Sequence, residues 1–160
     1  MSVAAEVLMP VWVVPYPSRI TFDQIRRAIP MNVLDTGRVR IEPQAYQHLL
    51  VTVYSEGEIS VSDACLVREY FSRFRSKVPV MVVRDCRYSF SPEVFIMLMK
   101  EAASFTSAAA YVDRSSTDNV MTNYAKSTYL RDVVVRSFAT QEEAASWVSQ
   151  FGPLPDRKQT

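Results

Sequence analysis

The chain has 160 residues, of which 48% are hydrophobic and 22% charged, and this length fits one globular domain that holds its core without a disulfide or a metal. Its 18 basic and 17 acidic residues give a net charge of +1, which argues against a dedicated nucleic-acid-binding protein. A local basic patch stays open, because Arg26, Arg27, Arg38 and Arg40 lie close together in the sequence.

The first 37 residues are irregular and contain four prolines, Pro10, Pro15, Pro17 and Pro30. Within them, residues 11–14 are expected to form a short strand, and residues 21–28 a short helix. The regular pattern begins at residue 38. We therefore predict an N-terminal extension over residues 1–37, a domain over residues 38–151 and a tail over residues 152–160, frayed from residue 154 on.

Two strands are predicted at the start of the domain. Residues 38–41 alternate between polar and apolar side chains, and residues 49–54 are apolar and β-branched. Residues 42–48 between them are expected to form a hairpin loop. Glu56 and Gly57 predict a turn after the second strand.

The first predicted helix begins after Ser60. Asp63 lies three positions further on, so that the two residues resemble a capping box with Asp in place of Glu. Apolar residues then recur at intervals of three and four, which is typical of an amphipathic helix. The expected buried face consists of Leu66, Val67, Tyr70, Phe71 and Phe74.

A continuous apolar run over residues 79–83 predicts a strand that is covered on both faces. The helix that follows has a strong start, with Ser91 as N-cap and Pro92 at the first helical position, and it is expected to run to Ser104. Its predicted core stripe consists of Phe95, Leu98, Met99 and Ala102. Ile96 and Met97 fall outside this stripe, where polar residues are usual.

The last third of the sequence predicts a strand over residues 108–112, a polar loop over 113–119 and a short helix over 120–126. A strand over residues 133–138 and a final helix after the capping box that opens at Thr140 complete the pattern. The final helix is expected to bury Ala144, Trp147, Val148 and Phe151.

From residue 38 the order of the predicted strands and helices is β-β-α-β-α-β-α-β-α. This order predicts an α/β fold with a mostly parallel sheet and an antiparallel edge hairpin.

The candidate chemical groups are few. His48 is the only histidine and lies far in sequence from Cys86 and Ser91, and no Cys, His, Asp and Glu residues have the spacing of a metal site. The three glycines are scattered, so a glycine-rich phosphate-binding loop is excluded. We therefore expect no enzyme, no cofactor and no metal.

The two cysteines, Cys65 and Cys86, form no CxxC pair and are interpreted as small apolar side chains, with a cytoplasmic location expected. No apolar run approaches the ~18 residues of a membrane span. The apolar run over residues 7–14 contains Pro10 and follows no basic residue, which argues against a signal peptide.

Four segments in order carry a family resemblance. They are Gly57-Glu58-Ile59-Ser60, the run from Val80 to Asp85 followed by Ser91, Ala109-Ala110-Tyr111-Val112 with Ser115 and Asn123-Tyr124, and Val135-Arg136-Ser137-Phe138 with Thr140, Glu142, Glu143, Ala144 and Trp147. This set resembles the SpoIIAA-like branch of the STAS domains, whose architecture is related to that of the lipid-binding CRAL-TRIO domains. The resemblance implies a SpoIIAA-like fold and a regulatory or binding function.

In the anti-sigma-factor antagonists of this fold, a kinase phosphorylates a serine at the start of the helix that follows a strand ending in aspartate, within the motif Asp-Ser-Ser-Gly-Leu. Here the stretch from Asp85 to Pro92 lacks the Ser-Ser-Gly core. Ser91 holds the comparable position and Ser89 is nearby, but Ser91 is interpreted first as a helix cap. Asp85 is interpreted as a strand-end residue or, alternatively, as a partner-facing acid.

The function predicted first is a non-catalytic regulatory protein–protein interaction module that acts alone or as a homodimer. Its predicted partner-binding residues are Asp85, Tyr88, Ser89, Ser91, Ile96 and Met97. Either the helix after Ser91 is more buried than usual, or its extra apolar residues face a partner. The alternative function is a carrier of a small apolar ligand or lipid, by analogy with CRAL-TRIO domains.

Residues Arg114, Ser115 and Ser116 form a candidate anion site, with ordinary turn and cap chemistry as the alternative.

Overall fold

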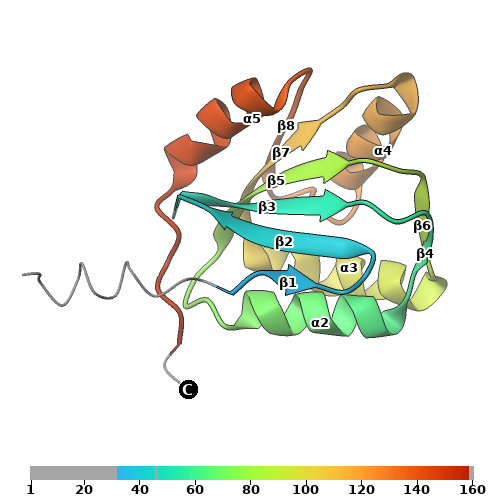
Figure 1. The fold of residues 1–160 in the computed structure, drawn as a ribbon, viewed down its shortest axis with the longest axis horizontal. Coiled ribbons are helices and arrows are strands. Elements are labelled where there is room, and N and C mark those ends of the chain that lie inside the picture. The colour runs from blue at the N-terminus through green and yellow to red at the C-terminus, as the bar shows by residue number, and fades with distance from the viewer. Residues whose placement is uncertain (1–31, 46, 159–160) are drawn as a thin grey trace, which may run out of the picture. The chain divides into compact units, whose positions relative to one another are not determined.

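The computed structural model describes residues 32–45 and 47–158. Six strands form one sheet in the order β1-β2-β3-β5-β7-β8 (Figure 1). Their bounds are β1 (Leu34–Asp35), β2 (Val39–Gln44), β3 (His48–Val53), β5 (Val78–Arg84), β7 (Thr106–Val112) and β8 (Val134–Phe138). The pairs β1–β2 and β2–β3 are antiparallel and the remaining pairs are parallel. The predicted mostly parallel sheet with an antiparallel edge hairpin is confirmed.

Helices cover both faces of this sheet. They are α2 (Val61–Ser72), α3 (Pro92–Phe105), α4 (Ser116–Ser127) and α5 (Gln141–Val148), which the short 3₁₀ helix η1 (Ser149–Phe151) follows. Figure 1 shows α5 on one side of the sheet and α2 and α3 on the other. Alternate residues of each strand therefore face different helices. On β5, Val80 packs in the core beneath α2 and α3, whereas Met81 packs with Val148 of α5.

A second, two-stranded sheet corrects two predictions. The strands β4 (Gly57–Ile59) and β6 (Tyr88–Phe90) pair in parallel, where the sequence predicted a turn and a loop. Three residues are too few to show an alternating pattern, and the pairing joins segments far apart in the chain. Gly57 has φ +106°, a conformation that favours glycine, so β4 begins where the predicted turn ends.

The helix caps follow the sequence closely. Ser60 and Asp63 form the predicted capping box, and Ser91 and Thr140 accept hydrogen bonds from backbone N–H groups of α3 and α5. Helix α4, in contrast, begins at Ser116, four residues before its predicted start. Its first turn is polar and gives no apolar period, which explains the error. Strand β2 also continues to Gln44, so the hairpin loop is shorter than predicted.

Some residues predicted to be buried are exposed. Leu66 of α2 is 45% exposed and Met99 of α3 is 48% exposed, so both predictions were wrong. Helix α3 instead buries Val94, with Leu98 and Ala102 partly buried on the same side at intervals of four. Phe151 is also partly exposed at 38%, although its ring packs on Trp147 with centroids 4.8 Å apart.

The segment after η1 was predicted to fray, and residues 153–158 contradict this. The Arg75 N–H donates to the carbonyl of Asp156 at 2.9 Å, and the Lys158 N–H donates to the carbonyl of Arg73 at 2.7 Å. The Arg157 guanidinium lies 5.1 Å from the ring centre of Tyr70. We call residues 153–158 the C-terminal strap, because they bind the end of α2.

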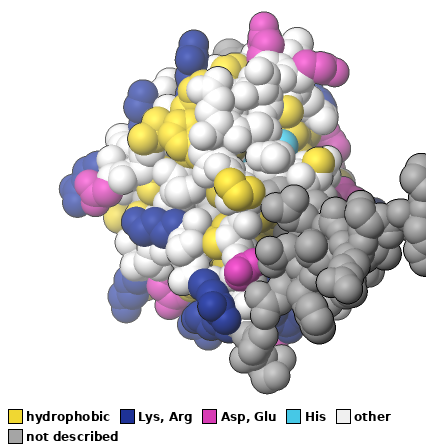
Figure 2. Space-filling model, turned by 90° about the vertical axis from the view of Figure 1, so that its left-hand side faces the viewer, with side chains coloured by type: hydrophobic (Ala, Val, Ile, Leu, Met, Phe, Trp, Pro, Cys, Tyr) yellow, Lys and Arg dark blue, Asp and Glu magenta, His cyan; other side chains and the backbone are white. Residues whose placement is uncertain are grey.

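Of the predicted N-terminal extension, only residues 32–37 are described, and there Leu34 pairs with Ile41 at the sheet edge. The strand predicted over residues 11–14 and the helix over 21–28 lie outside the described residues, and the domain boundaries stay a prediction. Among the helices of the described part, none has the length and apolar character needed to cross a bilayer. On the end of the domain seen in Figure 2, hydrophobic side chains lie in small groups between charged ones, as on an ordinary protein surface.

Candidate functional site

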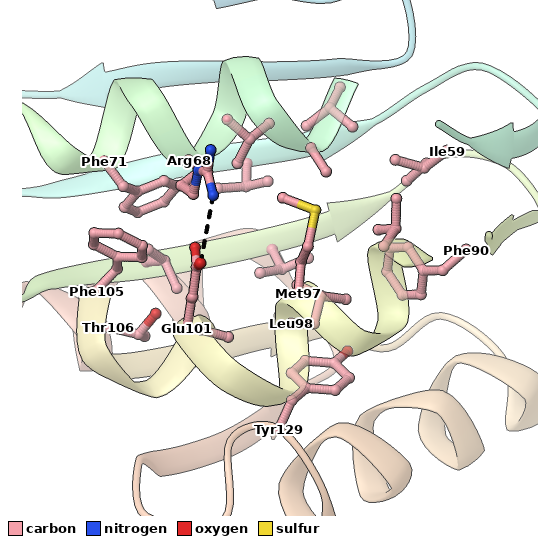
Figure 3. A pocket seen from close by; sticks show the side chains of 18 of the residues that line it. Ile59, Arg68, Phe71, Phe90, Met97, Leu98, Glu101, Phe105, Thr106 and Tyr129 are labelled. Carbon is pink, nitrogen blue, oxygen red and sulfur yellow. Dashed lines mark hydrogen bonds and ion pairs between the residues drawn. The ribbon is translucent and has the colours of Figure 1, made fainter. Parts of the chain in front are cut away.

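A partly open cavity of about 200 Å³ lies between α2, α3 and the sheet (Figure 3). Its floor is the sheet face formed by Val39, Val51, Val53, Val80, Val82 and Tyr111. Helix α2 contributes Ala64, Val67 and Phe71, and α3 contributes Val94, Met97, Leu98, Ala102 and Phe105. Almost all of these side chains are apolar, so the cavity suits a hydrophobic ligand.

The cavity exists because its middle is lined by small or short side chains. Valines of β3 and β5 form the floor, and Ala64 and Ala102 face it from the two helices. Larger rings lie at the ends. Figure 3 shows Phe71 and Phe105 at one end and Phe90 at the other. Between these rings, the short side chains leave the space between the helices and the sheet unfilled.

One ion pair joins the two helices at the cavity. Arg68 of α2 and Glu101 of α3 approach to 3.5 Å, and both line the cavity (Figure 3). Their side chains are 49% and 36% exposed, so solvent screens the pair. Such pairs contribute roughly 0–1 kcal/mol, and this one presents little obstacle to movement of the helices.

Three tyrosines, Tyr88, Tyr111 and Tyr129, line the cavity. Burial raises the pKa of Tyr111 well above its usual value of 10.0. Burial also raises the pKa of Tyr129 to about 12. Both phenols therefore stay protonated near neutral pH and can donate hydrogen bonds.

A buried ion pair lies beside these tyrosines, where β5 and β7 end. The Arg84 Nη1 donates to Asp113 Oδ1 at 3.1 Å, and the two side chains are only 1% and 6% exposed. Thr122 accepts a second hydrogen bond from Arg84 Nη1 at 2.9 Å, and the guanidinium lies 4.6 Å from the ring centre of Tyr111. The Arg84 charge is thus compensated within the fold, as a buried cation requires.

The predicted partner-binding residues do not form one surface. Ile96 is 53% exposed on α3, whereas Tyr88 and Met97 line the cavity. Ser91 is buried and caps α3, with its Oγ accepting from the Val94 N–H at 3.3 Å. Its predicted role as a cap is confirmed, and the partner-binding role of the set stays a prediction.

Asp85 and Ser89 lie on the surface of the described part, near the end of β5. The Arg114 Nη1 donates to Asp85 Oδ1 at 2.8 Å, so Asp85 already has an ionic partner. This contact joins the segments that follow β5 and β7. It was not predicted, because the two residues are distant in the sequence.

The candidate anion site at Arg114, Ser115 and Ser116 lies at the start of α4. Ser115 caps this helix, and its Oγ accepts from the Asp118 N–H at 3.1 Å. The Asp118 carboxylate in turn accepts from the Arg114 N–H at 2.9 Å. A carboxylate therefore already occupies the positive end of the helix, and the geometry favours cap chemistry. The anion site stays a prediction.

His48 lies on the sheet face opposite the cavity. Its Nδ1 is 3.3 Å from the Ser149 Oγ, and its side chain is buried. Among the described residues, neither Asp85 nor Ser91 is a hydrogen-bond partner of His48, which lies near the start of β5, whereas Asp85 follows its last residue. The cysteines Cys65 and Cys86 are free and half-buried, as predicted. Within residues 32–45 and 47–158, no three or more metal-binding side chains come together.

Sequence reasoning missed the cavity as a site. Val51, Val82 and Ala102 were read as ordinary core positions, and Tyr129, in the turn after α4, was not singled out. Apolar residues that recur at every second or every fourth position predict buried side chains. They do not show whether these side chains fill the space between the layers. Only the separation of α2 and α3 from the sheet shows this.

Comparisons with known proteins support the fold. No protein-family model and no curated protein matches the chain. A crystal structure of an uncharacterised DUF3478-family protein from Shewanella loihica PV-4, described as having a SpoIIAA-like fold, is similar with a TM-score of 0.52 and 12% identity. The match covers 69% of this chain and 91% of the other. The chain has a SpoIIAA-like fold. At this identity the likeness extends to the fold alone, so the function of the SpoIIAA-like domain must be argued from its own residues.

Proposed function

We propose that the SpoIIAA-like domain binds a small apolar molecule in the cavity between α2, α3 and the sheet. The observation that carries this proposal is a cavity of about 200 Å³ lined almost entirely by apolar side chains. A dry apolar cavity of about 150 Å³ engineered in another protein binds benzene. This cavity is larger, and it is partly open, so a ligand has a route into it. This was the alternative function in the sequence analysis and now comes first.

The size of the cavity limits the ligand to about the size of one substituted ring. A ligand with about ten non-hydrogen atoms that gains roughly 0.5 kcal/mol per atom binds with a Kd on the order of 0.2 mM. A binding function is favoured over catalysis, because the chain's one histidine, His48, lies on the other face of the sheet. Among the described residues that line the cavity, the only ion pair joins Arg68 and Glu101.

The test is titration of the protein with isopropylbenzene, followed by NMR of the backbone amides. Saturable shifts are expected at Val51, Val82 and Leu98. The variant Ala102→Phe fills the cavity from α3 and is expected to weaken binding at least tenfold. Met99→Phe places the same ring on the exposed side of α3 and is the matched control, since Met99 is 48% exposed. Unchanged binding by folded Ala102→Phe, or no saturable binding by the wild type, contradicts the proposal.

A second candidate function is protein–protein interaction, which the resemblance to regulatory domains implied. An apolar patch on α3 and α4 favours it, with Ile96 53% exposed, Val120 68% and Tyr124 53%. Phe95 of α3 stacks on Tyr124 with ring centroids 5.8 Å apart, so the two helices are in contact at Tyr124. The partner proposed is a second copy of the chain, because two-fold symmetric dimers are the commonest soluble assemblies.

Sedimentation equilibrium tests this second function. Self-association in the micromolar range is expected for the wild type, and Ile96→Asp should weaken it at least tenfold, because a charge is buried without a partner. Leu66→Asp is the control, since Leu66 is 45% exposed on α2 rather than on the patch. A wild-type protein that stays monomeric at high concentration excludes the homodimer.

A further inference from the structure

Besides Arg68, Glu101 and Thr106, the polar residues that line the cavity are three tyrosines, which we call the tyrosine wall and which indicate the chemistry of the ligand. Tyr88 comes from β6, Tyr111 from β7 and Tyr129 from the turn after α4. The Arg84 side chain contacts both the Tyr88 Oη, at 3.2 Å, and the Tyr111 ring, at 4.6 Å from its centre, so these two tyrosines lie close together. In Figure 3 the ring of Tyr129 extends toward Leu98 with its hydroxyl at the far end.

The hydroxyl groups of this wall are arranged as donors. The Arg84 Nε donates to the Tyr88 Oη at 3.2 Å, so the Tyr88 oxygen acts as an acceptor. Among the hydrogen bonds of the described residues, none has the hydroxyl of Tyr88 or Tyr129 as its donor. Each is free to donate to a ligand.

The wall carries no uncompensated charge. Arg84 contacts the wall, but Asp113 and Thr122 already occupy its Nη1, and Arg68, which lines the cavity, pairs with Glu101. A carboxylate ligand would be buried without a cation of its own, which is costly. An uncharged oxygen acceptor avoids this cost and still satisfies both donors.

We propose that the ligand is a small apolar molecule with one uncharged carbonyl oxygen, which accepts hydrogen bonds from Tyr129 and Tyr88 while its hydrocarbon part lies on the valine floor. This inference rests on the proposed function, because it names the ligand class of the same cavity. It goes beyond that function by assigning Tyr88 and Tyr129 as specificity-determining residues.

The test compares three probes of similar size by calorimetry and NMR: isopropylbenzene, acetophenone and benzoate. In Tyr129→Phe, acetophenone binding should weaken about fivefold, the value of one net hydrogen bond, while isopropylbenzene binding stays unchanged or improves. Tyr88→Phe should give the same selective loss. Tyr124→Phe is the matched control, because Tyr124 is 53% exposed and lies outside the cavity. Benzoate should bind the wild type more weakly than acetophenone.

The outcomes separate the two proposals. If isopropylbenzene does not bind the wild type saturably, the proposed function fails, and this inference fails with it. If isopropylbenzene binds but both folded Tyr→Phe variants affect the two neutral probes equally, only the assignment of the carbonyl is overturned. Tighter binding of benzoate than of acetophenone also overturns it, in favour of an anionic ligand.

Discussion

Two buried polar residues, Arg84 and His48, differ in whether a neighbouring group stabilises a charge on the side chain. The Arg84 cation is paired with Asp113, whereas among the described residues His48 has only the Ser149 hydroxyl as a partner and its buried Nε2 has none. Desolvation therefore lowers the pKa of His48 from its usual value of 6.5. The folded protein holds a neutral imidazole at a position where a charged one would be poorly solvated.

The lowered pKa of His48 predicts that the stability of the protein changes with pH because of this one residue. The folded state resists protonation of His48, whereas the unfolded chain takes up a proton as the pH falls through about 6.5. The free energy of unfolding should therefore be full above about pH 7 and should decrease as the pH falls below about 6.5. Urea denaturation of the wild type and of His48→Asn measures this.

The variant His48→Asn keeps an acceptor near Ser149 but does not titrate, so its stability should be nearly flat over the same interval. His48 is the only histidine of the chain, which makes the comparison simple. Equal slopes for the two proteins would show that His48 is not the group responsible.

At the scale of the element, local chemistry predicted where helices begin but not which face they bury. Ser60, Ser91 and Thr140 each cap a helix as the sequence indicated. On α3, however, Val94 is buried and Met99 is exposed, although both belong to one apolar run. When most residues of a helix are apolar, periodicity no longer defines a single face, and the neighbours decide. Here Val94 packs against α2 and the sheet, while Phe95 packs against α4.

The C-terminal strap is expected to hold the end of α2 in place. Deleting residues 156–160 removes the backbone hydrogen bonds that Asp156 and Lys158 make with Arg75 and Arg73. At about 1 kcal/mol per bond, amide exchange of the last turn of α2 should become faster by at least tenfold. Hydrogen exchange followed by NMR measures this.

The single variant Lys158→Ala is the control for this deletion, because it keeps the backbone N–H that binds Arg73. The amides at the end of α2 in this variant should exchange at the wild-type rate. Unchanged protection of Arg75 after the deletion would mean that the strap lies on α2 without stabilising it.

At the scale of the whole molecule, the cavity results from the way the layers are assembled. Valines at alternate positions of β3 and β5 face α2 and α3, and aromatic rings lie at the ends of the cavity. The tyrosine wall combines β6, β7 and the turn after α4. No contributing segment shows a binding motif by itself, and the site forms only where these segments pack together.

The sequence by itself determined the α/β order, the antiparallel edge and the principal helix caps, because these depend on interactions between residues close along the chain. It also indicated a SpoIIAA-like fold. The tertiary structure alone decided the pairing of β4 with β6, the buried face of α3, the strap and the cavity. These features depend on contacts between distant segments and on whether the side chains fill the space between the layers, and neither is encoded in local periodicity.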